Sequence, residues 1–134
     1  MKKIDELKQL LKSSSVQDVW YDVDLPKVGE LLNHLNEKEW ETIIAESECL
    51  PVSSQRKLSQ ASIYTENKNA LRLLLKLLHS TDTEVGTLVA ESLIEKNYKW
   101  DPEESIVEDL KRHIKQASEE QKKVLERLLG RLPC

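Results

Sequence analysis

The chain has 134 residues, a formal net charge of −4 and a hydrophobic content of 39 %. This length corresponds to one domain, and the hydrophobic content excludes wholesale disorder. The chain has 3 Gly and 4 Pro, which are too few for the frequent turns of a β-rich fold. No apolar run is long enough to span a membrane and the first residues are charged, so we expect a cytoplasmic protein with no membrane contact and no secretory signal.

Apolar side chains recur at helical spacing through most of the chain, which predicts an all-α fold of about eight helices. The fifth group is apolar on most sides, so we expect that helix to be a central one. In chain order, the groups are Ile4, Leu7, Leu10 and Leu11; Val28, Leu31, Leu32 and Leu35; Trp40, Ile43 and Ile44; Leu58, Ala61 and Tyr64; Leu71, Leu74, Leu75 and Leu78; Val85, Leu88, Val89 and Leu93; Ile106, Val107, Leu110 and Ile114; and Val124, Leu125, Leu128 and Leu129.

Helix-start signals precede several of these groups. A capping box places a short polar side chain three residues before Glu or Gln, so that each satisfies a backbone N–H of the first turn. That spacing is found at Asn36 with Glu39, Thr81 with Glu84, and Ser118 with Gln121. Asp101 followed by Pro102 predicts a further helix, with Asp101 as its cap and Pro102 as its first residue.

The helices are expected to form hairpins within one domain, 1–134. We expect N-terminal helices over 1–35 and helical pairs over about 37–64, 67–97 and 102–131. A period of roughly 30–35 residues is typical of helical repeats, because one amphipathic hairpin cannot cover its own apolar face and stacking a second hairpin on it buries both.

Residues 70–93 read ALRLLLKLLHSTDTEVGTLVAESL and resemble a HEAT repeat. The matching positions are Leu71, Leu74, Leu75, Leu78, Asp82, Val85, Ala90 and Leu93. Gly86 stands where the family usually has Arg. The resemblance implies antiparallel hairpins stacked as a short right-handed solenoid. It also implies a scaffold for protein binding, with a minority of the family binding DNA.

The segment 35–58 is similar to helical immunity proteins that accompany polymorphic or contact-dependent bacterial toxins. The residues that carry this likeness are Asn36-Glu37-Lys38-Glu39-Trp40, Leu50-Pro51 and Ser54-Gln55-Arg56-Lys57-Leu58. Such proteins are short, acidic and single-domain. The resemblance implies binding and blocking of one toxin, often a basic nuclease.

Charge alternates in blocks along the chain. Segments 13–50 and 81–110 each carry nine acids against two bases, whereas 51–80 and 111–134 are basic. Two interpretations stay open. Neighbouring helices of opposite charge attract one another across the surface, or the acidic blocks meet on one face and attract a basic partner.

The run from Asp18 to Asp24 is the first candidate binding segment. Trp20 and Tyr21 are adjacent, so from a helix they cannot both face one core. We expect one of them to pack and the other to be exposed among Asp18, Asp22 and Asp24, as an interface anchor. The alternative is that both aromatics fill a gap between the first two helices.

The sixth predicted helix carries the second candidate. Glu84, Glu91 and Glu95 share one helical face, which predicts an acidic ridge or, alternatively, a solvated outer face. Aromatic and acidic residues follow it. The candidate partner-binding residues of this segment are Glu84, Glu91, Glu95, Tyr98, Trp100, Asp101 and Glu104.

No catalytic or metal-binding motif is present in the sequence. His34, His79 and His113 lack a second ligand at helical spacing, and we expect His34 and His113 near exposed edges. Cys49 is expected to be a small buried side chain, and with Cys134 it defines neither a disulfide framework nor a zinc site. We expect no enzyme activity, no metal, no cofactor and no small-molecule substrate.

The sequence therefore predicts a non-catalytic protein-binding module. Its most concrete form is an immunity protein that occludes one basic toxin, possibly a nuclease, through the acidic and aromatic segments. The alternatives are a nucleic-acid-binding HEAT-like protein that uses the basic segments 51–80 and 111–134, or a general scaffold. Nucleic acid is disfavoured because the net charge is negative.

Overall fold

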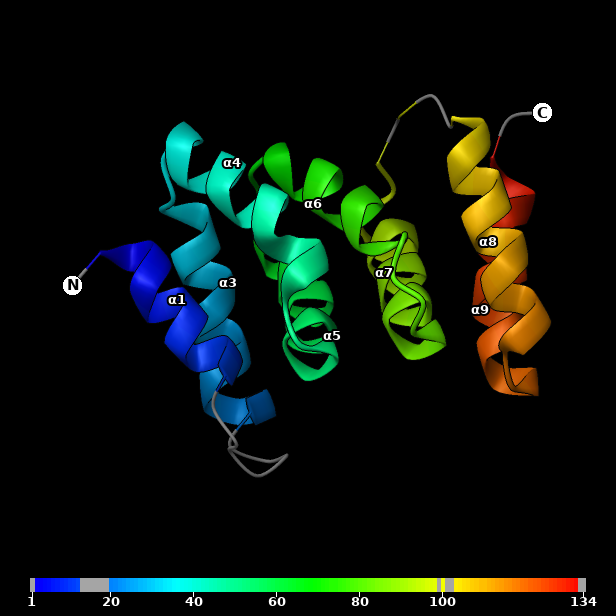
Figure 1. The fold of residues 1–134 in the computed structure, drawn as a ribbon, viewed down its shortest axis with the longest axis horizontal. Coiled ribbons are helices and arrows are strands. Elements are labelled where there is room, and N and C mark those ends of the chain that lie inside the picture. Colours follow the sequence, from blue (N-terminus) through cyan, green and yellow to red (C-terminus); the bar gives the residue numbers. More distant parts are fainter. Residues whose placement is uncertain (1, 13–19, 99, 101–102, 133–134) are drawn as a thin grey trace.

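A computed structural model describes residues 2–12, 20–98, 100 and 103–132 (Figure 1). Within these ranges all regular structure is helical, with eight α-helices and no strand, which confirms the all-α prediction for this part of the chain. The α-helices are α1 (Lys3–Lys12), α3 (Leu25–Asn33), α4 (Glu37–Glu46), α5 (Val52–Ala61), α6 (Asn69–Leu77), α7 (Thr83–Lys96), α8 (Glu104–Gln116) and α9 (Glu119–Arg131). A π-helical turn, η1 (Trp20–Asp24), leads into α3, and 3-10 turns η2 (Ser47–Cys49) and η3 (Ser62–Tyr64) follow α4 and α5.

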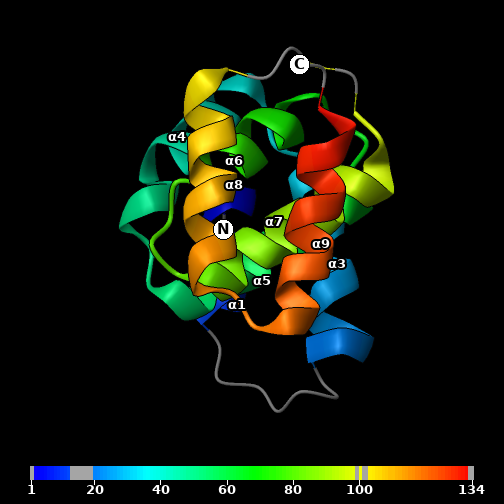
Figure 2. The same ribbon diagram turned by 90° about the vertical axis from the view of Figure 1, so that its right-hand side faces the viewer.

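The chain runs from α1 at one end of the molecule to α8 and α9 at the other (Figure 1). The helices α5, α7 and α9 follow one another in space, α5 against α7 and α7 against α9. The helix α4 packs against α6, and α8 packs beside α9 (Figure 2). The N-terminal helices α1 and α3 close the row by packing on each other and on α5. The helix α7 therefore has helices on both sides.

Local capping explains where several helices begin. The Asn36 side chain accepts a hydrogen bond from the Glu39 backbone N–H at 2.8 Å, and the Glu39 carboxylate accepts one from the Asn36 N–H at 3.1 Å. Ser118 and Gln121 form the same reciprocal pair at the start of α9. The capping boxes predicted at Asn36 and Ser118 are thus confirmed.

Two predicted helix starts are wrong. The cap of α7 is Asp82, whose carboxylate accepts from the Val85 N–H at 3.0 Å, and not Thr81. The helix α8 begins at Glu104 with Glu103 in the cap position, two residues later than Pro102. Asp101 and Pro102 themselves lie outside the described residues.

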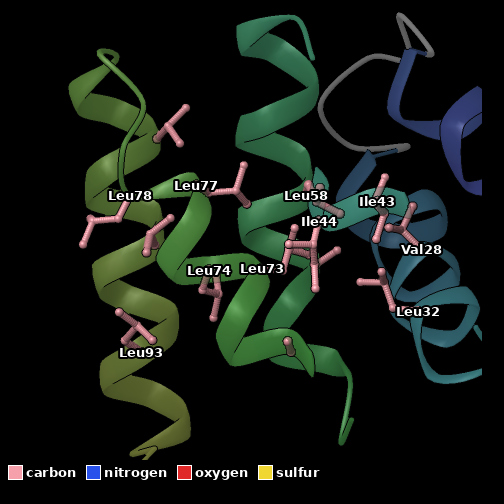
Figure 3. Packing of buried hydrophobic residues seen from close by; sticks show 14 of the residues in the cluster. Val28, Leu32, Ile43, Ile44, Leu58, Leu73, Leu74, Leu77, Leu78 and Leu93 are labelled. Atoms are coloured by element: carbon pink, nitrogen blue, oxygen red, sulfur yellow. The ribbon is translucent and has the colours of Figure 1, made fainter. Parts of the chain in front are cut away.

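One continuous apolar core runs through the molecule. Trp40 and Ile43 of α4, Leu58 of α5 and Leu73 and Leu74 of α6 are fully buried within it. Figure 3 shows this layer passing from α3 to α7. The predicted central helix is α6, although Leu71 and Leu75 on its flanks remain partly exposed, so its apolar surface is not covered all round.

Close backbone contact fixes α3 against η3. A Cβ atom on Gly29 would lie 2.4 Å from the Cβ of Tyr64, so only glycine fits at this point of α3. The Asn33 Oδ1 accepts hydrogen bonds from the Thr65 hydroxyl at 2.6 Å and from the Glu66 N–H at 2.8 Å. These contacts hold Tyr64 at the surface beside α7, with its side chain about half exposed.

Two side chains differ from the sequence-based expectation. His113 was expected near an exposed edge but is fully buried, because its ring fills the space beside Gly86. Cys49 was expected in the core but is exposed. The 3-10 turn η2 changes the helical period after Glu46, so that Ser47 faces the core in its place and donates to the Ile44 carbonyl at 2.7 Å.

Candidate functional site

A groove crosses the face formed by α5, α7 and α9. Its first hollow has a volume of ≈ 620 Å³ and lies between α3, η3, α7 and α9. A second hollow, of ≈ 650 Å³, continues it between α5, α7 and the start of α9. Leu88 and Gln60 line both hollows, so we treat the two as one feature, the α7 groove.

The first hollow has an apolar lining under a charged rim. The apolar contribution comes from four different elements, because α3, η3, α7 and α9 converge here. Its apolar and aromatic members are Leu25, Ile63, Tyr64, Leu88, Ile94 and Val124. A concave apolar surface with a few charged groups around it is the usual composition of a binding site.

The acidic face predicted on α7 lines this groove. Glu91 and Glu95 lie in the first hollow and Glu84 lies in the second, with Leu88 between them. Burial raises the pKa of the Glu91 carboxyl above its ordinary value, and the nearby charge of Glu84 raises it further. Glu84 also accepts a hydrogen bond from the Gln121 side chain of α9 at 2.9 Å.

Basic side chains from the two neighbouring helices share the groove with these acids. Lys123 and Arg127 of α9 line the first hollow beside Glu91 and Glu95. In the second hollow, Arg56 and Lys57 of α5 stand with Asp82 and Glu84. Acids and bases are thus equal in number in each hollow, and the lining carries balanced charge.

This balance favours one of the two interpretations of the charge blocks. The acidic segment 81–110 supplies α7, and the basic segments 51–80 and 111–134 supply its neighbours α5 and α9. Opposite charges therefore meet on adjacent helices. Cations lie among the acids in both hollows, so the groove does not present the purely negative surface expected for attracting a basic partner.

A two-point ion pair at the groove joins α5 to the cap of α7. Arg56 donates from Nε and Nη2 to the two carboxylate oxygens of Asp82, at 3.1 Å and 3.0 Å. The Arg56 hydrogen bonds lower the pKa of the Asp82 carboxyl, helped by the Val85 N–H and opposed by partial burial. The pKa of the Arg56 guanidinium is raised by the same contact.

Trp20 lies at the edge of the groove and is packed there, so it is not the exposed interface anchor. Trp20 is 5 % exposed and its indole N–H donates to Gln60 Oε1 at 2.8 Å. The Lys57 ammonium lies 5.3 Å from the centroid of the Trp20 ring, within cation–π range. Trp20 therefore packs against the rest of the chain.

The structure describes only some of the acidic residues of the Trp20 segment. Asp24 is buried at the end of η1. Asp18 lies outside the described residues, as do the side chains of Tyr21 and Asp22. The exposed apolar side chain of the described segment is Val23, at 58 %.

The residues that follow α7 do not join the groove. Tyr98 and Trp100 are partly buried and pack on the core, and burial raises the pKa of the Tyr98 hydroxyl. Glu104 is exposed at the first position of α8, and Asp101 is outside the described residues. The structure therefore brings Glu84, Glu91 and Glu95 together and leaves Tyr98, Trp100 and Glu104 elsewhere.

Sequence reasoning missed the apolar centre of the groove and its α9 wall. Leu88 was assigned to the core stripe, yet the spacing 84, 88, 91, 95 places it on the acidic face of α7, and this signal was available. Lys123, Val124 and Arg127 gave no such signal. Only the packing of α9 on α7 brings them to the groove.

The described part of the chain holds no group of three His, Cys, Asp or Glu side chains close enough to bind a metal ion. None of its helices combines the length and apolar character needed to cross a membrane. Comparison with family models, curated proteins and solved structures gives no match.

Proposed function

We propose that this chain is a non-catalytic protein-binding protein and that it binds its partner in the α7 groove. The observation that carries the proposal is the groove itself, which has an apolar centre at Leu88 and charged residues along both walls. Interfaces of this kind bury an apolar patch and use the surrounding charges to select the partner.

The proposed architecture is a short right-handed HEAT-like solenoid. Support comes from the order of contacts, in which α5, α7 and α9 form one row and α4 packs on α6. The pair Arg56–Asp82 links the second helix of one proposed hairpin to the turn of the next, where the resemblance to HEAT repeats expects an Asp. A row of second helices is the surface such repeats use for binding.

The most concrete version is an immunity protein that blocks a bacterial toxin in the cytoplasm. Glu91 and Glu95 are exposed acceptors for Lys or Arg of a basic toxin, and Tyr64 and Leu88 offer the apolar contact. Binding there would occlude the toxin surface that contacts nucleic acid. A general scaffold would use the same groove for a different partner.

Nucleic-acid binding is the less supported alternative. Two arginines of the basic segments 51–80 and 111–134 are engaged within the chain, since Arg56 is paired with Asp82 and Arg112 donates to the Ser80 carbonyl and to Asp109. Lys111, Lys115 and Lys123 are exposed, but the acids of α7 lie beside Lys123. Phosphate binding requires cations that are not already neutralised.

The test combines the purified chain with the product of the adjacent reading frame. We expect a stable complex by calorimetry and relief of that product's toxicity when both are expressed together. The variant Leu88→Lys places a charge at the centre of the groove and should abolish both effects. Ala45→Lys, on an exposed position of α4 outside the groove, is the matched control. Full protection by Leu88→Lys, or the absence of any complex with the wild-type chain, contradicts the proposal.

A further inference from the structure

The two walls of the first hollow carry opposite charges in matching rows. On α7, Glu91 and Glu95 are four residues apart, and on α9, Lys123 and Arg127 are also four residues apart. Four residues make about one helical turn, so each pair forms a row along its helix. The helices α7 and α9 pack directly on each other, which sets the two rows on either side of one apolar strip.

These four charged side chains have no hydrogen-bond or ion-pair partner within the described ranges, 2–12, 20–98, 100 and 103–132. Other charged residues nearby are already engaged, including Glu84 with Gln121 and Arg56 with Asp82. The rows are therefore the charges at this groove that remain available to a partner. Their signs differ, so a uniformly basic partner would gain from one row and be repelled by the other.

We propose that the partner segment bound by the α7 groove is an amphipathic α-helix with charge rows of opposite sign. Its basic row, spaced by one turn, faces Glu91 and Glu95, and its acidic row faces Lys123 and Arg127. Between the rows an apolar stripe rests on Leu88 and Val124. This inference rests on the proposed function and specifies the partner of the same groove.

Three features of the groove suit a helix. A helix placed along α7 and α9 presents side chains at the same one-turn spacing as the two rows. The strip between the rows is apolar, as a helix-binding groove requires. Partial burial of Glu91 disfavours the charged form of its carboxyl group. A cation from the partner would stabilise that charged form and offset the effect of burial.

The test is a selection from a displayed library of amphipathic helices against the folded chain. Every member keeps one leucine stripe, and the two flanking rows are randomised among Lys, Glu and Ala. A parallel selection uses the variant with Glu91, Glu95, Lys123 and Arg127 all replaced by Gln, after circular dichroism shows that it retains its helical content. Enriched sequences are then made as peptides and their affinities measured by fluorescence anisotropy.

We expect enrichment of helices with Lys in one row and Glu in the other, and at least tenfold weaker binding of those peptides to the four-Gln variant. Exchanging the charges of both walls should keep the preference for one basic and one acidic row. Enrichment of helices with Lys in both rows overturns this inference but leaves the protein-binding proposal standing. Enrichment without charge preference, or no enrichment above the four-Gln variant, also overturns it. The proposed function fails separately, by the Leu88→Lys test.

Discussion

The imidazole ring of His113 on α8 occupies the space in which a side chain at Gly86 on α7 would stand. A Cβ atom at Gly86 would lie 2.6 Å from Cδ2, 2.7 Å from Nε2 and 2.8 Å from Cε1 of that ring. The Nε2 atom is 2.9 Å from the Leu78 carbonyl oxygen, which holds the ring in place. The two residues therefore set how closely α8 approaches α7. They also account for the glycine at position 86, where the HEAT repeat that this segment resembles usually has Arg.

Gly86→Ala is expected to lower the free energy of unfolding, because the ring of His113 has no room to move within the core. Overpacking of this kind costs about 1–3 kcal/mol. Urea denaturation followed by circular dichroism measures the change.

Gly130→Ala is the matched control, because it also replaces a helical glycine but nothing lies within 4 Å of the added atom. It should stabilise the chain by up to about 1 kcal/mol through helix propensity. Equal effects of the two substitutions would show that the Gly86–His113 contact does not limit packing.

Stability should fall at mildly acidic pH because of His113. Burial lowers the pKa of its imidazole, and Arg112 lowers it further, against the Leu78 carbonyl and the carboxylates of Asp109 and Asp82. The unfolded chain binds a proton on this residue at a pH of about 6.5, while the folded chain keeps the ring neutral. The unfolding free energy therefore decreases as pH drops below about 6.5, by at most about 1.4 kcal/mol per pH unit, until the folded pKa is reached.

Denaturation of the wild-type chain and of His113→Gln between pH 7.5 and 5 checks this dependence. The substitution should reduce the slope over that range. His34→Gln changes an exposed histidine and should leave the slope as it is. An unchanged slope in His113→Gln would show that His113 is not the group responsible.

Arg56→Gln should weaken the link between α5 and α7. It removes a two-point contact with Asp82, but Arg56 is 46 % exposed, so solvent screening keeps the expected loss to about 1 kcal/mol. Because the contact lowers the folded pKa of Asp82, its contribution is present above the unfolded pKa and is lost as pH falls through the folded value. Variant and wild type should thus converge in stability in strong acid.

Lys122→Gln supplies the comparison for this pair. The Lys122 ammonium is 3.7 Å from Glu119, whose side chain is 89 % exposed, so its removal should change stability by a few tenths of a kcal/mol at most. A loss in Arg56→Gln no greater than in Lys122→Gln, by thermal or urea denaturation at neutral pH, would contradict the structural role of Arg56.

Asn33→Ala is expected to loosen the turn that carries Tyr64. It leaves the buried Thr65 hydroxyl and the Glu66 N–H without their acceptor, which costs about 1–3 kcal/mol. Hydrogen exchange should show faster exchange of the Glu66 amide. Glu30→Ala, at an exposed position of the same helix, should leave that amide protected as in the wild type. Unaltered Glu66 exchange in Asn33→Ala would rule out the proposed anchoring.

Much of the helical framework could be predicted from the sequence. Apolar spacing predicted the eight helical segments, and the capping boxes at Asn36 and Ser118 are present as expected. The common face of Glu84, Glu91 and Glu95 also follows from their spacing along one helix. All of these features depend on residues within a few turns of each other, and local hydrogen bonding and helical period are enough to determine them.

The composition of the groove was decided by the tertiary structure. Lys123 and Arg127 are more than 25 residues from the acids they stand beside, and His113 is buried only because Gly86 leaves it space. Leu88 lines the groove because none of the described helices covers it there. Helical period indicates which residues share a face, but not which distant helix that face meets. The helix that a face meets depends on the side-to-side packing of α5, α7 and α9. Shape complementarity and buried area over the whole core determine that packing.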